Sequence, residues 1–352
     1  MKKVLLILLV TLFAVSMMFV GIGCKATAAT ETTAAAETTV ADAAETTAAE
    51  TSSSAVAGEE LFISVIAHND VSNSYEVPIG NGVKQAGADY GVKVEFVSPP
   101  KIDAQAQLAL IDGALAKGAD ALAIMVADSD ALVPRIKEIT AQGIPVVLFQ
   151  GGAQVWEESG ALCFIGGDSY SDGQFVAKTL IDAGCKNIVI DNHVQGELNI
   201  EVRDQGFKDY AEAAGVKYTE IITDVTSVEN TAAAYKAAFM KDPTIDGITG
   251  GWCGISGQAI VPVLEELNLL GKVNIGIMDY TTDYLELIKE GKVQWSTTLQ
   301  QWTNGYYAVS FLVNKIKYNV APTGVILTGP FKIDKNNVDS ILDAINAGNG
   351  VW

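Results

Sequence analysis

Between residue 60 and about residue 280 the chain alternates short apolar runs with longer segments of helical spacing. The apolar runs span about four to eight residues and are rich in Val and Ile, which predicts buried strands. They are LFISVIAH, VKVEFV, ADALAIMV and IPVVLF in the first half, and CKNIVI, VKYTEII, DGITG and KVNIGIM in the second. Helices are predicted over residues 74–91, 104–118, 129–143, 201–215, 229–241 and 256–271. Apolar strands that alternate with helices predict an α/β fold, with parallel sheets covered on both faces.

The two halves share a short internal repeat. Gly82-Val83-Lys84 stands nine residues before Gly91-Val92-Lys93, and Gly206-Phe207-Lys208 stands nine before Gly215-Val216-Lys217. Each pair marks the first predicted helix and second predicted strand of a half. The folded part is also too long for one simple core, so we expect two similar α/β lobes. The cleft between such lobes is a natural place for a ligand.

Charge and motifs exclude several classes of function. The formal net charge is −19 without a Lys/Arg cluster, which disfavours nucleic acid because phosphate contacts need cationic side chains. There is no phosphate-binding GxxxxGK, no GxSxG and no HExxH motif. The only two histidines, His68 and His193, each stand at the end of a predicted strand and have no third ligand at helical spacing, so no metal site is expected. We expect neither a cofactor nor enzymatic activity.

The amino terminus combines three features. Lys2 and Lys3 precede an apolar stretch over residues 4–20, and Gly21-Ile22-Gly23-Cys24 follows. This pattern resembles the lipobox of bacterial lipoproteins, which implies a signal peptide at 1–23 and a lipidated Cys24 as the mature terminus. The alternative is an uncleaved membrane anchor with an incidental cysteine. Residues 24–58 are rich in Thr, Ala, Ser and Glu and lack aromatic residues, which predicts a disordered tether outside the cytoplasm.

The remaining cysteines are Cys163, Cys185 and Cys253. An odd number at wide spacing argues against a disulfide scaffold. A single Cys163–Cys185 bridge is one alternative, and buried free thiols are preferred.

Specific stretches then carry a family resemblance. These are SVIAHND…SYEVPIGNGV, ADALAIMVADSDALVPRIKEITAQGIPVVLF, IGGDSYSDGQFVAKTL, EVRDQGF and NIGIMD. Together they resemble the ribose-binding-protein branch of periplasmic binding proteins, which feed sugar ABC transporters. The resemblance implies a monomeric Venus flytrap of two Rossmann-like lobes joined by a three-strand hinge. The lobes would be 59–167 with about 301–328, and 168–300 with about 329–352.

The resemblance also implies a ligand site at the strand ends, and an ABC permease as partner. The residues it assigns to the ligand are Asn69, Asn73, Tyr75, Gln150, Asp168, Asn199, Arg203, Trp252, Asp279 and Gln300. Four positions depart from the family pattern: Glu76 replaces an aromatic residue, Gly151 an arginine and Trp252 an asparagine, and the usual arginine near Arg203 aligns closer to Glu201. The pocket is therefore expected to be more aromatic than a pentose site.

Other interpretations stay open. Asp168 and Asp279 could instead cap helices beginning at Ser169 and Thr281, and Trp252 could pack between the lobes. The favoured ligand is a sugar or sugar alcohol. The alternative ligand is a nucleoside or other ring compound. The alternative functions are a receptor that presents its ligand to a chemosensor and a tethered hydrolase.

Overall fold

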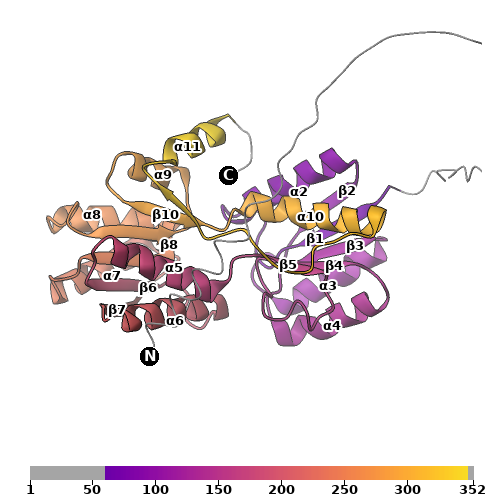
Figure 1. Cartoon of the computed structure of the whole chain (residues 1–352), viewed down its shortest axis with the longest axis horizontal. Coiled ribbons are helices and arrows are strands. Elements are labelled where there is room, and N and C mark those ends of the chain that lie inside the picture. The colour runs from indigo at the N-terminus through magenta and orange to yellow at the C-terminus, as the bar shows by residue number, and fades with distance from the viewer. Residues whose placement is uncertain (1–59, 348–352) are drawn as a thin grey trace, which may run out of the picture. The chain divides into compact units, whose positions relative to one another are not determined.

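The computed structural model describes residues 60–347 as two α/β lobes, each built on a six-stranded sheet (Figure 1). The predicted signal peptide, Cys24 and the tether lie outside the described residues. The predicted two-lobed α/β architecture with mostly parallel sheets is confirmed. Among the described residues, no helix has the length and apolar character needed to cross a membrane.

The first sheet has the strand order β11-β5-β4-β3-β1-β2, and all its strand pairs are parallel. The strands are β1 (Phe62–Ile66), β2 (Lys93–Val97), β3 (Ala121–Ile124), β4 (Val146–Phe149), β5 (Cys163–Gly166) and β11 (Gly324–Leu327). Helices α2 (Glu76–Tyr90) and α10 (Gln301–Tyr318) bury their apolar side chains on one face, and α3 (Ala104–Ala116) and α4 (Ser129–Ala141) on the other.

The second sheet repeats this order as β12-β10-β9-β8-β6-β7, with only the β10–β12 pair antiparallel. Its strands are β6 (Asn187–Asn192), β7 (Lys217–Ile222), β8 (Gly247–Trp252), β9 (Asn274–Met278), β10 (Trp295–Thr298) and β12 (Phe331–Asp334). Helices α5 (Ser169–Asp182) and α6 (Leu198–Ala213) pack on one face. The other face is covered by α7 (Val228–Lys241), α8 (Gln258–Glu266), α9 (Thr282–Lys289) and α11 (Val338–Asn346).

The chain passes between the two sheets three times. It leaves the first sheet after β5 and enters α5, returns after β10 into α10, and leaves again between β11 and β12. Cys163 lies in β5 of the first sheet, whereas Cys185 precedes β6 of the second. Both are buried free thiols, as is Cys253, so the preferred prediction is confirmed and the alternative bridge is wrong.

Helix boundaries differ from prediction where a polar residue caps the helix. Helix α6 begins three residues before the predicted Glu201, because the Glu197 carboxylate accepts a hydrogen bond from the amide of Ile200 at 2.9 Å. Helix α9 is capped by Thr281 rather than by Asp279. The alternative in which Asp168 caps a helix does form, since its carboxylate accepts a hydrogen bond from the amide of Ser171 at 2.7 Å.

The glycines of the internal repeat mark close helix contacts. A Cβ on Gly82 of α2 would lie 2.1 Å from the carbonyl oxygen of Trp302 in α10, and one on Gly206 of α6 would lie 2.1 Å from that of Tyr170 in α5. Gly305 and Gly173 complete the two contacts, since a Cβ there would lie 2.2 Å and 1.8 Å from carbonyl oxygens of α2 and α6. The repeat therefore records one packing motif used once in each lobe.

We expect Gly82→Ala to lower the free energy of unfolding by about 1–3 kcal/mol or more, because the added methyl group forces two backbones apart. The matched control is Gly113→Ala in α3, where an added Cβ meets no atom within 4 Å. That control is expected to gain about 0.5–1 kcal/mol from helix propensity. Urea denaturation followed by circular dichroism measures both. Equal stabilities of the two variants would contradict the close-contact assignment.

Candidate functional site

A cavity of about 430 Å³ lies where the carboxyl ends of strands from both sheets meet, and we call it the inner cavity. Its size falls within the ~300–1,000 Å³ typical of small-molecule sites. Open parallel sheets bind ligands at this end of their strands. The polar and aromatic lining comprises His68, Asn69, Asn73, Tyr75, Gln150, Ser169, Asp172, His193, Glu197, Asn199, Arg203, Trp252, Asp279, Thr297 and Thr298.

Eight of the ten residues assigned from sequence line this cavity: Asn69, Asn73, Tyr75, Gln150, Asn199, Arg203, Trp252 and Asp279. Asp168 lines a neighbouring cavity of about 280 Å³ and caps α5. Gln300 is not part of the inner-cavity lining, and its amide nitrogen donates to the carbonyl oxygen of Thr328 at the crossing. The structure therefore brings most of the predicted set together and leaves Asp168 and Gln300 beside it.

A hydrogen bond joins Tyr75, the N-cap residue of α2, to Gln150, which directly follows β4. The Tyr75 hydroxyl donates to Oε1 of Gln150 at 2.8 Å, and Nε2 of Gln150 is buried with no hydrogen-bond partner in the described chain. Gln150 has a φ of 58° and Asp279 a φ of 61°, in the left-handed region that residues with a side chain seldom adopt. Such strain persists where the surrounding structure fixes it, and it concentrates at binding sites.

Acidic side chains form one part of the inner cavity. Asp172 is 4% exposed, and its Oδ1 has no hydrogen-bond partner in the described chain. Burial raises the pKa of Asp172 to about 7, with a further contribution from the charge of Asp168. Burial also raises the pKa of Asp279 to about 6, although Arg203 and a hydrogen bond from Nε2 of Gln301 at 3.1 Å oppose the shift.

Arg203 is the cationic residue of the lining. Its Nε and Nη2 donate to Oδ1 of Asp204 at 3.1 Å and 2.9 Å, and both residues are buried. The guanidinium is therefore already engaged with one carboxylate inside the lobe. Its charge still reaches the cavity, because it lowers the pKa of both Asp172 and Asp279 against the effect of burial.

Trp252 is held at the cavity by an irregularity in β8. The strand register shifts between Gly250 and Trp252, and a π-helical turn, Cys253–Gly257, follows. A Cβ on Gly254 would lie 2.5 Å from the indole ring, so that glycine leaves the space that the ring occupies. Trp252 thus lines the cavity while it also packs against the core of the second lobe.

A buried carboxylate supports the same segment. Asp191 at the end of β6 accepts hydrogen bonds from the hydroxyls of Thr223, Tyr235 and Ser256, the last at 2.9 Å. A Cβ on Gly251 would lie 2.4 Å from Oδ2 of Asp191, so the backbone next to Trp252 approaches this carboxylate directly. Because Ser256 belongs to the π-helical turn, Asp191 fixes the turn that carries Trp252.

Seven polar lining residues were not assigned from the sequence: His68, Ser169, Asp172, His193, Glu197, Thr297 and Thr298. His68 and His193 occupy matching positions after β1 and β6, and burial lowers their pKa to about 4 and about 3, so both are neutral near pH 7. Their position at the ends of predicted strands was the available signal. In GGDSYSDG the family resemblance assigns the first aspartate, Asp168, to the ligand, and no pattern distinguishes the second, Asp172.

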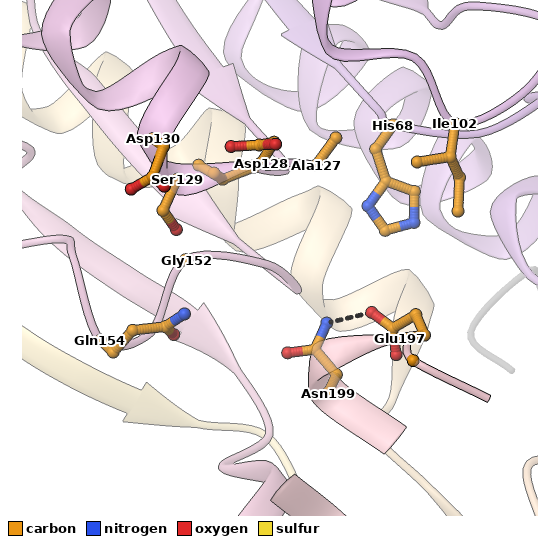
Figure 2. A pocket seen from close by; sticks show the side chains of 12 residues that line it. His68, Ile102, Ala127, Asp128, Ser129, Asp130, Gly152, Gln154, Glu197 and Asn199 are labelled. Atoms are coloured by element: carbon orange, nitrogen blue, oxygen red, sulfur yellow. Dashed lines mark hydrogen bonds between the residues drawn. The ribbon is translucent and has the colours of Figure 1, made fainter. Parts of the chain in front are cut away.

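A second cavity of about 420 Å³, which we call the outer cavity, adjoins the inner one (Figure 2). The two share His68, Ile102, Glu197 and Asn199 in their linings. Figure 2 shows Asp128, Ser129 and Asp130 on one side and Glu197 and Asn199 on the other, with Nδ2 of Asn199 donating to Glu197 at 3.2 Å. The inner cavity therefore continues into a second space of similar volume, lined by polar side chains from both lobes.

Two α/β lobes with a polar cavity at their facing strand ends define a solute-binding protein. The family model described as "periplasmic binding protein domain" matches residues 63–319, so the chain belongs to that family. Because this family consists of solute-binding proteins, the chain is a binding protein rather than an enzyme.

Relatives extend over most of the folded part. The D-ribose/D-allose-binding protein of Pseudomonas aeruginosa is 26% identical over 233 residues, 63% of this chain and 72% of that protein. A carbohydrate transporter from Acidothermus cellulolyticus, solved with myo-inositol, is 27% identical with a TM-score of 0.71 and covers 83% of this chain and 100% of its own. A solute-binding protein from Burkholderia graminis, solved with D-arabinose, is 25% identical with a TM-score of 0.69, over 80% and 97%.

The buried acid at the start of α2 makes stability depend on pH. Glu76 is 1% exposed, its Oε2 has no partner in the described chain, and burial raises its pKa to about 8. From its ordinary pKa up to about 8, the folded protein keeps a proton that the unfolded chain releases, so stability falls as pH rises across this window. Above it, we expect Glu76→Gln to be more stable than the parent by up to about 5 kcal/mol, because the pKa of Glu76 rises from 4.5 to about 8 and each pKa unit corresponds to ~1.4 kcal/mol.

Thermal melts of parent and variant between pH 5 and pH 9 measure this difference. The matched control is Glu157→Gln, at an exposed position, which is expected to leave the pH dependence as in the parent. A constant difference between parent and Glu76→Gln at all pH values would contradict the assignment.

Proposed function

We propose that this protein is an extracytoplasmic, lipid-anchored receptor that captures a sugar or sugar alcohol in the inner cavity and delivers it to an ABC permease. The observation that carries the proposal is the lining of the inner cavity, in which amides, carboxylates and hydroxyls stand beside Tyr75 and Trp252. A polyol needs hydrogen-bond donors and acceptors for its hydroxyls and aromatic faces for its C–H surface. The relatives solved with myo-inositol and D-arabinose support the same ligand class.

The three chain crossings support a mechanism in which the lobes close around the ligand. Lining residues come from both lobes, so a ligand that touches both favours the closed arrangement over the open one. The residues we assign to the ligand are those that line the inner cavity, with Asp168 and Gln300 beside them. We propose that the protein acts as a monomer.

A ring-shaped ligand such as a nucleoside is the second candidate. Trp252 and Tyr75 favour it, because an aromatic side chain stacks on a base as well as it covers a sugar face. Presentation of the bound ligand to a chemosensor would use the same site. A ligand panel separates the first two candidates: D-ribose, D-allose, D-arabinose and myo-inositol on one side, adenosine and uridine on the other.

Binding from that panel is expected to change the intrinsic tryptophan fluorescence. We expect Trp252→Ala to remove most of this change and to weaken affinity by roughly 2–4 kcal/mol, at about 25 cal/mol per Å² of buried ring. Titration calorimetry measures the affinity. The control is Trp156→Phe, at a position that packs against the first lobe and lies outside the inner cavity. Binding by Trp252→Ala as tight as that of the parent would refute the aromatic part of the site.

The anchor is tested separately. Because small residues precede Cys24 and a polar segment follows it, we expect Cys24→Ser to accumulate as an unlipidated precursor that stays in the aqueous phase during detergent partitioning. The control is Cys185→Ala, which removes a buried thiol of the folded part and is expected to partition with detergent as the parent does. Detergent partitioning of Cys24→Ser that matches the parent would rule out lipidation at this residue.

A further inference from the structure

The inner cavity has an excess of negative charge. Among its lining residues the carboxylates are Asp172, Glu197 and Asp279, and Arg203 is the one side chain that is always cationic. The two histidines of the lining are neutral, because burial lowers the pKa of His68 and His193 to about 4 and about 3. The lining therefore carries more acidic than basic groups before any ligand enters.

Existing contacts account for only part of this charge. Arg203 donates twice to Asp204, so its guanidinium is engaged behind the cavity wall. Glu197 caps α6 and also accepts from Asn199, so its carboxylate is used by the fold. Asp172 and Asp279 remain, and neither forms an ion pair with a side chain of the described part of the chain.

The two lobes offer an internal comparison at Asp172. Asp172 follows Ser169, the first residue of α5, by three positions, and Asn304 follows Gln301, the first residue of α10, by three. Asn304 is fully buried, its Nδ2 donates to the carbonyl oxygens of Leu299 at 2.7 Å and Gln300 at 3.0 Å, and its Oδ1 accepts from Thr328 at 3.0 Å. The same place in the second lobe thus has a carboxylate whose Oδ1 lacks any such partner.

An unpaired carboxylate at such a buried position disfavours folding unless something compensates it. Asp172 and Asp279 both lie in the wall of the inner cavity. They are close enough for the charge of Asp279 to contribute to the raised pKa of Asp172. Both also act on the hydroxyl of Tyr75, whose pKa is raised by burial and then by Asp279, Glu76 and Asp172. Asp172, Asp279 and Tyr75 therefore lie near one another in the wall of the inner cavity.

We propose that the natural ligand is a polyol that carries a protonated amine, such as an amino sugar or an aminocyclitol, with its ammonium group held by Asp172 and Asp279. This rests on the proposed function, because the rest of the cavity is assigned to hydroxyl groups and C–H faces. Within residues 60–347, no three His, Cys, Asp or Glu side chains stand close enough together to hold a metal ion. A ligand ammonium group needs no such convergence, since its three donors point in different directions.

The test compares ligands that differ at one carbon only. Each sugar set contains the hydroxyl, amine and acetamide forms of one sugar: D-glucose, D-glucosamine and N-acetyl-D-glucosamine, with the galactose and mannose sets beside them. The pair of scyllo-inositol and scyllo-inosamine adds the hydroxyl and amine forms of a cyclitol. Titration calorimetry at pH 7 on the full mature chain gives each dissociation constant. We expect at least one amine to bind about tenfold to a hundredfold more tightly than its hydroxyl and acetamide partners, the range of a charge-assisted hydrogen bond.

Isosteric variants then locate the effect. Asp172→Asn and Asp279→Asn keep the shape of the side chain and remove its charge, and each is expected to reduce the preference for the amine about tenfold or more. The matched control is Asp103→Asn, which replaces the cap of α3 outside the cavity with another good capping residue and is expected to keep the preference unchanged.

The inference is overturned if every amine binds no more tightly than its hydroxyl partner, or if both cavity variants keep the full preference of the parent. Tight binding of a neutral polyol with a Trp252 fluorescence change would, in that case, leave the proposed function standing. Absence of binding by every sugar, inositol and amine in the sets would count against both.

Discussion

Each lobe depends on a close backbone contact between two helices, one of which begins directly after a chain crossing. In the first lobe the pair is α2 and α10, and in the second it is α6 and α5 (Figure 1). Glycines at matching places, Gly82 with Gly305 and Gly206 with Gly173, allow the two backbones of each pair to approach. Helices α5 and α10 are the first elements that the chain forms after it crosses to the other lobe. The helix contact therefore fixes the position at which each crossing enters that lobe.

The position of the site follows from that contact. Asp172 lies one residue before Gly173 in α5, and Gln301, which hydrogen-bonds to Asp279, is the first residue of α10. The same helix packing that assembles the lobes therefore places polar side chains at the cavity. A substitution in a helix contact is expected to shift the cavity side chains on the same helix, because the helix backbone is rigid over such a short distance.

The fold of the described residues was largely predictable because the signals are local. Apolar runs, glycines at helix ends and capping residues all act within a few positions. The short internal repeat of Gly82-Val83-Lys84 and Gly206-Phe207-Lys208 indicated that the chain forms two similar lobes. Trp252 was also predictable, since it ends an apolar run among glycines that leave room for its ring. The family pattern added Tyr75, Gln150 and Asp279, which the structure places on the inner cavity.

What was not predictable arises from contacts between distant segments. Gln300 turns its amide to Thr328 because two chain crossings run side by side there, and no local pattern records that neighbour. The π-helical turn after Trp252 depends on Asp191, which belongs to a strand far away in the sequence. Asp172 looks like any polar residue in the first turn of a helix, and only its burial in the assembled lobe distinguishes it.

The charge of the whole chain acts in the same direction as the charge of the cavity. A net charge of −19 surrounds the protein with a negative potential, which attracts cationic ligands and repels anionic ones at low ionic strength. A sugar phosphate would meet Asp172 and Asp279 at the inner cavity, and the arginine there is already engaged with Asp204. At the proposed site, discrimination against anionic sugars would arise from unfavourable contacts as well as favourable ones, which is how binding sites commonly achieve specificity.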